Sequence, residues 1–150
     1  MTNDLQIRPA DIAEAEVIAD LYLRSRAWAL PTVPVAHEAD DVRRWFREYL
    51  LPKTDTFVAV QDGTIVGFMS LDNHWVVQLY LEPGLTGKGV GTQLLDLAKL
   101  RFPTGLKLWT FQVNERARKF YEKHGFVVSE MTEGEGNEEH TPDALYKWGY

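Results

Sequence analysis

The sequence predicts a single α/β domain built on one mixed β-sheet. With 150 residues, the chain has the usual size of one domain. The β-rich runs 56–61 and 64–71 are joined by Asp62-Gly63, a dipeptide that favours a tight hairpin and hence antiparallel pairing. Further along, segments with helical periodicity alternate with strands, as crossover connections require. Neither an internal repeat nor a linker interrupts this order, so residues 1–150 are expected to form one domain.

The first half of the chain predicts a strand, two helices and a three-stranded meander. Residues 5–8 alternate apolar and polar side chains, which is the pattern of a short half-buried strand. Asp11, with Glu14 three residues later, forms a capping box that predicts a helix directly after it. A second helix is expected from about Glu38, with apolar side chains at helical spacing, and Pro52 should end it. Three strands follow, over residues 56–61, 64–71 and 75–81.

The second half predicts two helices that alternate with three strands. The glycine-rich stretch 87–91 opens a helix that runs to about residue 100. Asn114 can cap the next helix, and Gly125 suits the left-handed residue that ends it. Strands are expected over residues 106–113, 126–131 and 144–148. The polar segment 132–142 is too long for a hairpin turn, and loops of that length tend to be functional or disordered.

Charge and cysteine content exclude several classes of function. The 16 basic and 22 acidic residues give a net charge of −6, which disfavours nucleic acid or an anionic membrane as a partner of the whole surface. Cysteine is absent, so a disulfide framework, a thiolate nucleophile and a cysteine-ligated zinc are excluded. The four histidines lack the spacing of a metal site. The first residues lack a signal-peptide pattern, and no apolar run approaches about 20 residues, so we expect a cytoplasmic protein.

The segment Gly87-Lys88-Gly89-Val90-Gly91 has the properties of an anion site. Glycines let successive backbone N–H groups point at one place, and the helix that follows adds the partial positive charge of its N-terminus. A pyrophosphate is the natural ligand. Thr92 stands where a dinucleotide-binding fingerprint needs its third glycine, and Val90 follows Gly89 where a Walker motif needs Lys. That the glycines serve only a tight turn stays open as the alternative.

Taken with its surroundings, this segment resembles the GNAT superfamily of acetyl-CoA-dependent N-acetyltransferases. Thr86–Gly91 stands at the place of the family's Gln/Arg-x-x-Gly-x-Gly/Ala motif, after the strand residues Leu79–Leu81, and Asn114–Phe126 is similar to its second signature. One departure is Thr86, where the family usually carries Gln or Arg. The resemblance spans essentially the whole chain. It implies a mixed, mostly antiparallel sheet of about seven strands with about four helices, in which the fourth and fifth strands splay into a V.

The resemblance also implies acetyl-CoA as co-substrate, with no metal. The main chain of the fourth strand would pair with the pantetheine as an added strand does. Asn114 would contact the pantetheine or the pyrophosphate, although it can equally be a plain helix cap. The cofactor-binding residues are then Leu79, Tyr80 and Leu81 for the pantetheine, Thr86, Gly87, Lys88, Gly89, Val90, Gly91 and Thr92 for the pyrophosphate, and Asn114.

Acetyl transfer to an amine raises two proton problems. Neutralising a lysine-like amine at pH 7 costs about 4.6 kcal/mol, so a base or a path to water must remove its proton. His74, near the start of the fourth strand, is the candidate base, although a surface role is the alternative. Tyr121 matches the family's tyrosine acid, and proton transfer from an ordinary tyrosine to a thiolate is uphill by about 2 kcal/mol, which favours hydrogen bonding to that thiolate. Without a cysteine, direct attack within a ternary complex is expected.

The acceptor is expected to be a primary amine, on a small molecule or a peptide, and cationic. Segment 132–142 holds four glutamates, and a bound cationic substrate would relieve their mutual repulsion. The alternative is that these glutamates only form a solvated charged loop. The aromatic content of the chain is compatible with a dimer surface, so a homodimer stays open. A second function stays open, that of an inactive acyl-CoA-binding sensor. The candidate acceptor residues are Trp28, His37, Trp75, Gln78, Glu138 and Glu139.

Overall fold

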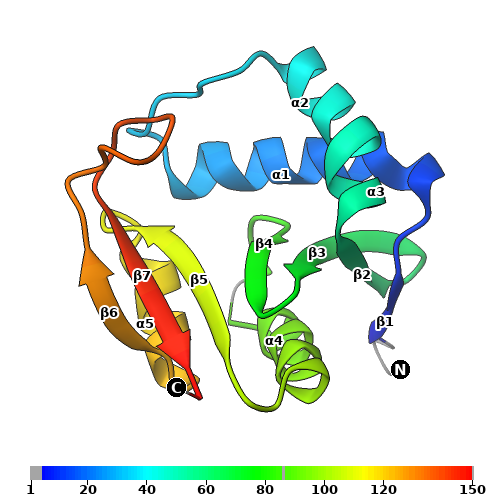
Figure 1. The fold of residues 1–150 in the computed structure, drawn as a ribbon. Helices are drawn as coiled ribbons and strands as arrows, with labels where there is room; N and C mark the ends of the chain where they lie inside the picture. The colour runs from blue at the N-terminus through cyan, green and yellow to red at the C-terminus, as the bar shows by residue number, and fades with distance from the viewer. Residues whose placement is uncertain (1–4, 86, 150) are drawn as a thin grey trace.

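A computed structural model describes residues 5–85 and 87–149, so Thr86 of the predicted cofactor turn lies outside the described residues. Figure 1 shows the chain as a central sheet with helices above and below it. The elements in chain order are β1 (Leu5–Pro9), η1 (Ile12–Glu14), α1 (Ala15–Ala29), α2 (Ala39–Trp45), η2 (Phe46–Leu50), α3 (Leu51–Lys53), β2 (Asp55–Gln61), β3 (Thr64–Asp72), β4 (Trp75–Leu81), α4 (Val90–Arg101), β5 (Leu106–Phe111), α5 (Glu115–Lys123), β6 (Val127–Met131) and β7 (Asp143–Trp148).

The described strands form one seven-stranded sheet in the order β1-β2-β3-β4-β5-β7-β6, which confirms the predicted fold class. All neighbours are antiparallel except β4 and β5. These two parallel strands are paired only at Trp75 and Lys107, near their starts, and then separate toward their C-terminal ends (Figure 1). The predicted V is therefore present, and it divides the sheet into a four-stranded and a three-stranded part.

The local signals of the sequence explain how the elements begin and turn. The capping box of Asp11 and Glu14 is formed, and a single 3₁₀ turn (η1) leads from it into α1. Asp62 and Gly63 both have positive φ, +51° and +77°, as a tight hairpin turn with a type I′ backbone requires. The second helix, a continuous run of α2, η2 and α3, passes Pro52 and ends at Lys53, so the predicted end was wrong.

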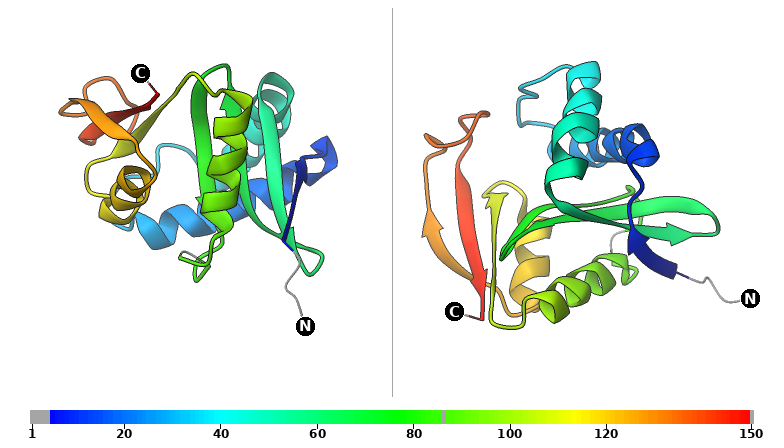
Figure 2. Two further views of the ribbon diagram at one scale, coloured as in Figure 1. Left: turned by 90° about the horizontal axis from the view of Figure 1, so that it is seen from below. Right: turned by 45° about the vertical axis from the view of Figure 1, so that its right-hand side comes forward.

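Two hydrophobic clusters hold helices on opposite faces of the sheet (Figure 2). On one face, Ile18 and Leu21 of α1 and Phe46 of η2 pack over β2 and β3. On the other face, Leu94 and Leu95 of α4 belong to the larger cluster, which also includes residues of β5, α5 and β7. The helices thus cover the sheet around β4, whose C-terminal half borders the gap. In residues 5–85 and 87–149, no helix combines the length and apolar character needed to cross a membrane.

Candidate functional site

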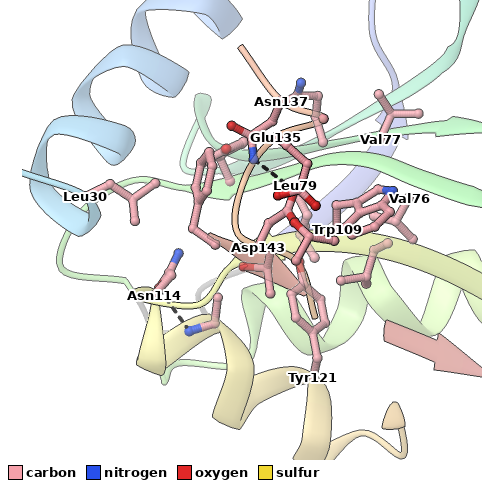
Figure 3. Close-up of a pocket in the computed structure, with 18 residues that line it drawn as sticks. Leu30, Val76, Val77, Leu79, Trp109, Asn114, Tyr121, Glu135, Asn137 and Asp143 are labelled. Carbon is pink, nitrogen blue, oxygen red and sulfur yellow. Dashed lines mark hydrogen bonds between the residues drawn. The ribbon is translucent and has the colours of Figure 1, made fainter. Parts of the chain in front are cut away.

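The gap between β4 and β5 is a cavity of about 490 Å³ (Figure 3). Its walls come from the two splayed strands, from the start of α5 and from segment 132–143. This cavity, called the V cavity below, includes two of the side chains that sequence reasoning placed near the acetyl group, Gln78 and Tyr121. Its lining residues are Leu30, Val76, Val77, Gln78, Leu79, Tyr80, Leu108, Trp109, Thr110, Phe111, Asn114, Ala117, Tyr121, Thr132, Glu135, Gly136, Asn137 and Asp143.

The phenol of Tyr121 is the most chemically distinctive group of the V cavity. Tyr121 lies on α5, one helical turn after Ala117, and its ring packs against Phe120 and Phe126. Burial raises its pKa above the ordinary value of a tyrosine, because the phenolate would lose its solvation. The hydroxyl therefore stays protonated across the physiological range. Tyr121 can donate a hydrogen bond into the cavity, but it is a weaker proton donor than an exposed tyrosine.

The edge of β4 that borders the cavity offers backbone hydrogen bonds. The N–H of Glu82 donates to the carbonyl of Val66 on β3, at 2.8 Å. Hydrogen-bonded and non-hydrogen-bonded pairs alternate along an antiparallel ladder, so the N–H and C=O groups of Leu79 and Leu81 point away from β3, toward the gap. Tyr80 points its backbone groups toward β3. Of the three residues expected to pair with a pantetheine, two therefore present the necessary groups.

The side chain of Tyr80 has a structural position. Its ring meets Tyr22 edge-on at 4.8 Å and stacks on Phe68 at 6.0 Å, within the cluster under α1. Burial raises its pKa far above that of an ordinary tyrosine. Tyr80 thus fixes α1 against β4, while its neighbours in sequence face the α4 side.

The glycine turn leads from β4 into α4 as the sequence predicts. Gly87 and Gly89 have φ of +80° and +88°, a conformation that side chains rarely adopt, and Gly89 caps α4 without a side-chain hydrogen bond. The first N–H groups of α4 therefore have no cap from Gly89, which is the arrangement that suits an anion. Lys88 is exposed on this turn. Residues 87–92 thus have a backbone geometry that suits the predicted cradle, and their binding of a pyrophosphate stays a prediction.

Two residues of this turn also hold the fold. The side chain of Val90 is buried in the core, so only its backbone faces a ligand. A Cβ added at Gly91 would lie 3.1 Å from the ring of Phe120, which shows that Gly91 allows α4 and α5 to approach each other. The same addition at Gly89 meets nothing within 4 Å. Gly89, and not Gly91, is therefore the position at which binding can be tested without disturbing packing.

The remaining cofactor candidates are Asn114, which caps the start of α5, and Thr92, in the first turn of α4. The side-chain oxygen of Asn114 accepts from the N–H of Ala117 at 3.2 Å, so the helix-cap role is present, while its amide nitrogen can donate toward the V cavity. The hydroxyl of Thr92 lies 3.1 Å from Nε2 of His124 and links the start of α4 to the end of α5. Burial lowers the pKa of His124, with nearby Lys99 adding to the effect.

A second cavity of about 420 Å³ lies between α1, α2 and the loop after β6. It gathers four of the six predicted acceptor residues, and Gln78 lines both this cavity and the V cavity, so it marks where the two adjoin. We call it the acceptor cavity. Its lining residues are Tyr22, Leu23, Arg26, Val35, Ala36, His37, Asp41, Val42, Trp45, Phe46, Gln78, Glu138 and Glu139.

The acidic loop 132–142 is ordered by its own hydrogen bonds. The amide of Asn137 donates to the Thr141 carbonyl and to the Asp143 carboxylate, at 2.7 and 3.0 Å. The hydroxyl of Thr132 donates to the same carboxylate. Gly134, at φ +91°, lies so close to the backbone of Thr141 that no side chain would fit there. These contacts hold the loop in one conformation, and a functional role of the loop stays a prediction.

Two glutamates of this loop pair with groups across the acceptor cavity. Glu138 lies 2.6 Å from Nε2 of His37, and Glu139 lies 3.1 Å from the guanidinium of Arg26. Mutual repulsion among free carboxylates was expected here, but these two have partners of the protein itself. In Figure 1 the cyan segment after α1 and the orange loop after β6 accordingly lie side by side.

Arg26 is a site residue that sequence reasoning missed. It is buried on α1 and donates to the Pro34 carbonyl at 2.9 Å and to the Tyr22 hydroxyl at 3.2 Å, while its Nε has no hydrogen-bond partner among residues 5–85 and 87–149. The sequence could have indicated that Arg26 is buried, because residue 26 falls eight positions after Ile18, on the apolar face of the helix. Trp109, Asn137 and Asp143 were also missed, since their sequence surroundings are those of an ordinary strand and loop.

Three of the predicted catalytic and acceptor residues, His74, Trp75 and Trp28, line neither cavity. His74 donates from Nδ1 to the Gly105 carbonyl at 2.8 Å and packs on Phe102, at the closed end of the V. The ring of Trp75 lies under the ammonium of Lys107, and Trp28 is exposed beside Arg116. Their assigned roles as base and as walls of the acceptor site stay predictions, and the geometry described here gives them no direct path to the cavities.

Comparisons with known proteins show the family to which the chain belongs. Residues 52–128, just over half of the chain, match the family model described as an acetyltransferase (GNAT) domain. The peptidyl-lysine N-acetyltransferase YiaC of Escherichia coli K12 is 28% identical over 123 residues, which cover 81% of this chain and 83% of YiaC.

Solved structures show the same fold. The solution structure of apo-form YjaB from Escherichia coli superposes with a TM-score of 0.81 at 26% identity, and 97% of each chain is covered. PaiA N-acetyltransferase from Thermoplasma acidophilum, in complex with coenzyme A, superposes with a TM-score of 0.73 at 21% identity, and the match covers 98% of this chain and 99% of the PaiA chain. The residues that match the family model include the glycine turn and Tyr121, and a match over this share of the sequence means that the chain belongs to the GNAT family of acetyltransferases.

Proposed function

We propose that this protein transfers the acetyl group of acetyl-CoA to a primary amine by direct attack within a ternary complex. The observation that carries the proposal is the meeting of two cavities at Gln78. One cavity is lined by a buried, protonated tyrosine and by an open strand edge, and the other has an acidic rim. Two substrates could thus bind from different sides and meet without a covalent enzyme intermediate.

The residues of the V cavity and the glycine turn fit acetyl-CoA. Leu79 and Leu81 would pair with the pantetheine amides, because their backbone groups point away from β3. The N–H groups of residues 87–92, helped by Lys88, would receive the pyrophosphate at the start of α4. Asn114 would donate from its amide nitrogen. When bound, acetyl-CoA supplies an activated thioester carbonyl.

The reaction then needs only groups that the site presents. The amine nitrogen attacks the thioester carbonyl carbon, a C–N bond forms, and the C–S bond breaks. The hydroxyl of Tyr121 would donate a hydrogen bond to the departing sulfur, in keeping with a pKa that burial raises. Before the attack, the ammonium would lose one proton through the acceptor cavity, whose rim carries His37 and Glu138. Once the C–N bond has formed, the nitrogen would lose a second proton, and the departing thiolate takes up a proton to leave as the CoA thiol.

The properties of the acceptor cavity and of a relative support an amine. Asp41, Glu138 and Glu139 place three carboxylates against the guanidinium of Arg26 and the imidazole of His37, a balance that favours a cation. YiaC, by its name, acts on peptidyl-lysine, which is itself a primary amine. PaiA, by its description, binds coenzyme A.

The first test measures CoA release from acetyl-CoA over a panel of primary amines. We expect turnover with at least one alkylamine. If the folded protein binds acetyl-CoA but releases no CoA with any amine, the acyl-CoA sensor is the correct function instead.

The cofactor site is tested by Gly89→Asp, which places a carboxylate where the pyrophosphate is proposed to bind. Isothermal titration should show acetyl-CoA affinity reduced about tenfold or more, because like charges in a partly buried site repel strongly. Gly63→Asp is the matched control, since Gly63 also has positive φ and open space around it, but lies in the β2–β3 hairpin. Equal affinity of the two variants would contradict the site.

A further inference from the structure

The acidic loop 132–142 lines both cavities, one after the other along its length. Residues 135–137 line the V cavity, whereas Glu138 and Glu139 line the acceptor cavity. The loop therefore passes the place where the two cavities adjoin, which Gln78 marks on β4. Residues 135–137 are thus on the side where acetyl-CoA is proposed to bind, within a few residues of the path by which the amine would arrive.

Two of the described residues that line the V cavity carry carboxylates, and they differ in their surroundings. Both oxygens of Asp143 are engaged, because one accepts from the hydroxyl of Thr132 and the other accepts from the amide of Asn137. The carboxylate of Glu135, by contrast, has no hydrogen bond or ion pair within the described part of the chain. Glu135 is also exposed, so its carboxylate can exchange protons with water.

Glu135 and Tyr121 reach the V cavity from different elements, and Figure 3 shows both among the side chains around it. Tyr121 belongs to α5. Glu135 belongs to the loop after β6, which the hydrogen bond from Asn137 to Asp143 ties to the start of β7. A thioester in this cavity would thus have the Tyr121 hydroxyl for its sulfur and, from a separate wall, a free carboxylate for the nitrogen that attacks it.

The second proton of the proposed reaction needs an acceptor of this kind. Once the C–N bond has formed, the nitrogen carries a positive charge, and losing a proton gives it an electron pair that the amide delocalises. This proton is therefore far more acidic than that of an alkylammonium, for which an ordinary carboxylate is too weak a base. A carboxylate is sufficient at this step. His74, the base predicted from the sequence, is held at the closed end of the V.

We propose that Glu135 is a catalytic residue whose carboxylate accepts a hydrogen bond from the attacking nitrogen and then receives the proton that this nitrogen loses. The N–H bond breaks, its electron pair stays on the amide nitrogen, and the exposed carboxyl group passes the proton to water. The negative charge of the carboxylate also stabilises the positive charge that develops on the nitrogen as the C–N bond forms. This inference rests on the proposed function, because it names a catalytic group of the same reaction.

The first experiment compares Glu135→Gln with Glu133→Gln. Both changes replace an exposed carboxylate of the same loop with an amide of the same size, but Glu133 lines neither cavity. The rate constant of acetyl transfer is measured in a single turnover, with enzyme in excess over acetyl-CoA and with saturating n-butylamine, or with whichever amine of the panel reacts faster.

In Glu135→Gln we expect this rate constant to fall about 10²-fold or more, which is the usual contribution of a positioned acid or base. The amine concentration that gives half of the maximal rate, the affinity for acetyl-CoA and the far-UV circular dichroism should change little. Glu133→Gln should keep the wild-type rate constant.

The second experiment distinguishes a missing proton acceptor from a disturbed loop. Glu135→Ala leaves space where the carboxyl group stood, and formate can enter this space as a substitute carboxylate. Sodium formate should raise the single-turnover rate constant of Glu135→Ala several-fold, whereas sodium chloride at the same ionic strength should not. Glu133→Ala should not respond to formate. A loss of rate in Glu135→Ala that formate does not relieve would assign Glu135 to the structure of the loop and overturn its catalytic role.

The outcomes separate this inference from the function on which it rests. A wild-type rate constant in Glu135→Gln would overturn the role of Glu135 and leave the acetyltransfer reaction standing. The same holds if only the half-saturating amine concentration rises, because Glu135 would then attract the amine without acting in the reaction. Failure of the wild-type protein to acetylate n-butylamine or any other amine of the panel would overturn the proposed function and the inference together.

Discussion

At the scale of single residues, burial decides what Tyr121 can do. Sequence reasoning favoured hydrogen bonding to the thiolate on the basis of an ordinary tyrosine, and the structure gives a pKa that burial raises further above that of a thiol. Proton transfer from this phenol is therefore more uphill than from an ordinary tyrosine. Hydrogen-bond donation to the leaving sulfur is the remaining role that the geometry supports.

We predict that Tyr121→Phe lowers kcat by about 10²–10⁴-fold with little change in acetyl-CoA affinity. The phenyl ring keeps its packing, so the loss reports on the hydroxyl alone. Tyr146→Phe is the comparison, because Tyr146 is also buried but donates to Glu122 and receives from Arg118. Steady-state kinetics that gave both variants wild-type kcat, with chemistry rate-limiting, would reject the role of Tyr121.

The two neighbouring glutamates of the acidic loop differ in surroundings. Glu139 is mostly buried against Arg26, whereas Glu138 and His37 are exposed. Glu139→Gln should lower the free energy of unfolding by on the order of 3 kcal/mol, because it leaves the Arg26 charge buried without its counterion. Glu138→Gln should cost less than about 1 kcal/mol. Urea unfolding of the two variants checks this, and equal losses would mean that the Arg26 pair is not buried in solution.

This difference could not be read from the sequence. Glu138 and Glu139 are adjacent and identical in type, and their partners lie about a hundred residues earlier in the chain. Residue types predicted which side chains gather near an acceptor, but only the fold assigns each carboxylate its partner. For the same reason His74 attracted attention as an ionisable group near β4, although its ring is held at the closed end of the V.

At the scale of elements, local sequence signals predicted most of the fold. β4 has the predicted bounds, residues 75–81, and Asp62-Gly63 forms the expected hairpin. The errors fall where a regular pattern is interrupted, as at Pro52, where the preceding π-helical turn lets the helix continue to Lys53. Cavity walls were less predictable, because they depend on how far β4 and β5 diverge, and this distance has no local signal.

The contact between α4 and α5 predicts a response to acid. Burial lowers the pKa of His124 below its usual 6.5, so below that pH the unfolded chain takes up a proton that the folded chain resists. The contribution of His124 to stability is therefore present above about pH 6.5 and lost as pH falls through the lowered pKa. Urea unfolding at pH 7.5 and at pH 5.5 checks this: the free energy of unfolding should decrease more between the two pH values for wild type than for His124→Gln. Identical decreases in the two proteins would mean that the imidazole of His124 is exposed to solvent in the folded protein.

At the scale of the whole molecule, charge predicts how the acceptor approaches. The net charge is −6, and the acceptor cavity has carboxylates at its entrance. For n-butylamine, a cation at pH 7, kcat/KM should fall several-fold as salt rises from 0.05 to 0.5 M, because screening shortens the range of attraction to less than about 10 Å. Aniline, which is neutral at this pH, is the control. A salt response shared by both acceptors would assign the effect to something other than steering.

The gap between β4 and β5 has a further consequence for solubility. An unpaired strand edge usually invites another chain to add a strand, and proteins avoid this by covering or charging such edges. Here the free edge of β4 faces a cavity of about 490 Å³ that β5 closes from the other side. A foreign strand, with side chains on both of its faces, is too bulky to enter a space of that size. The protein can thus keep a strand edge free for a slender ligand without exposing a template for aggregation.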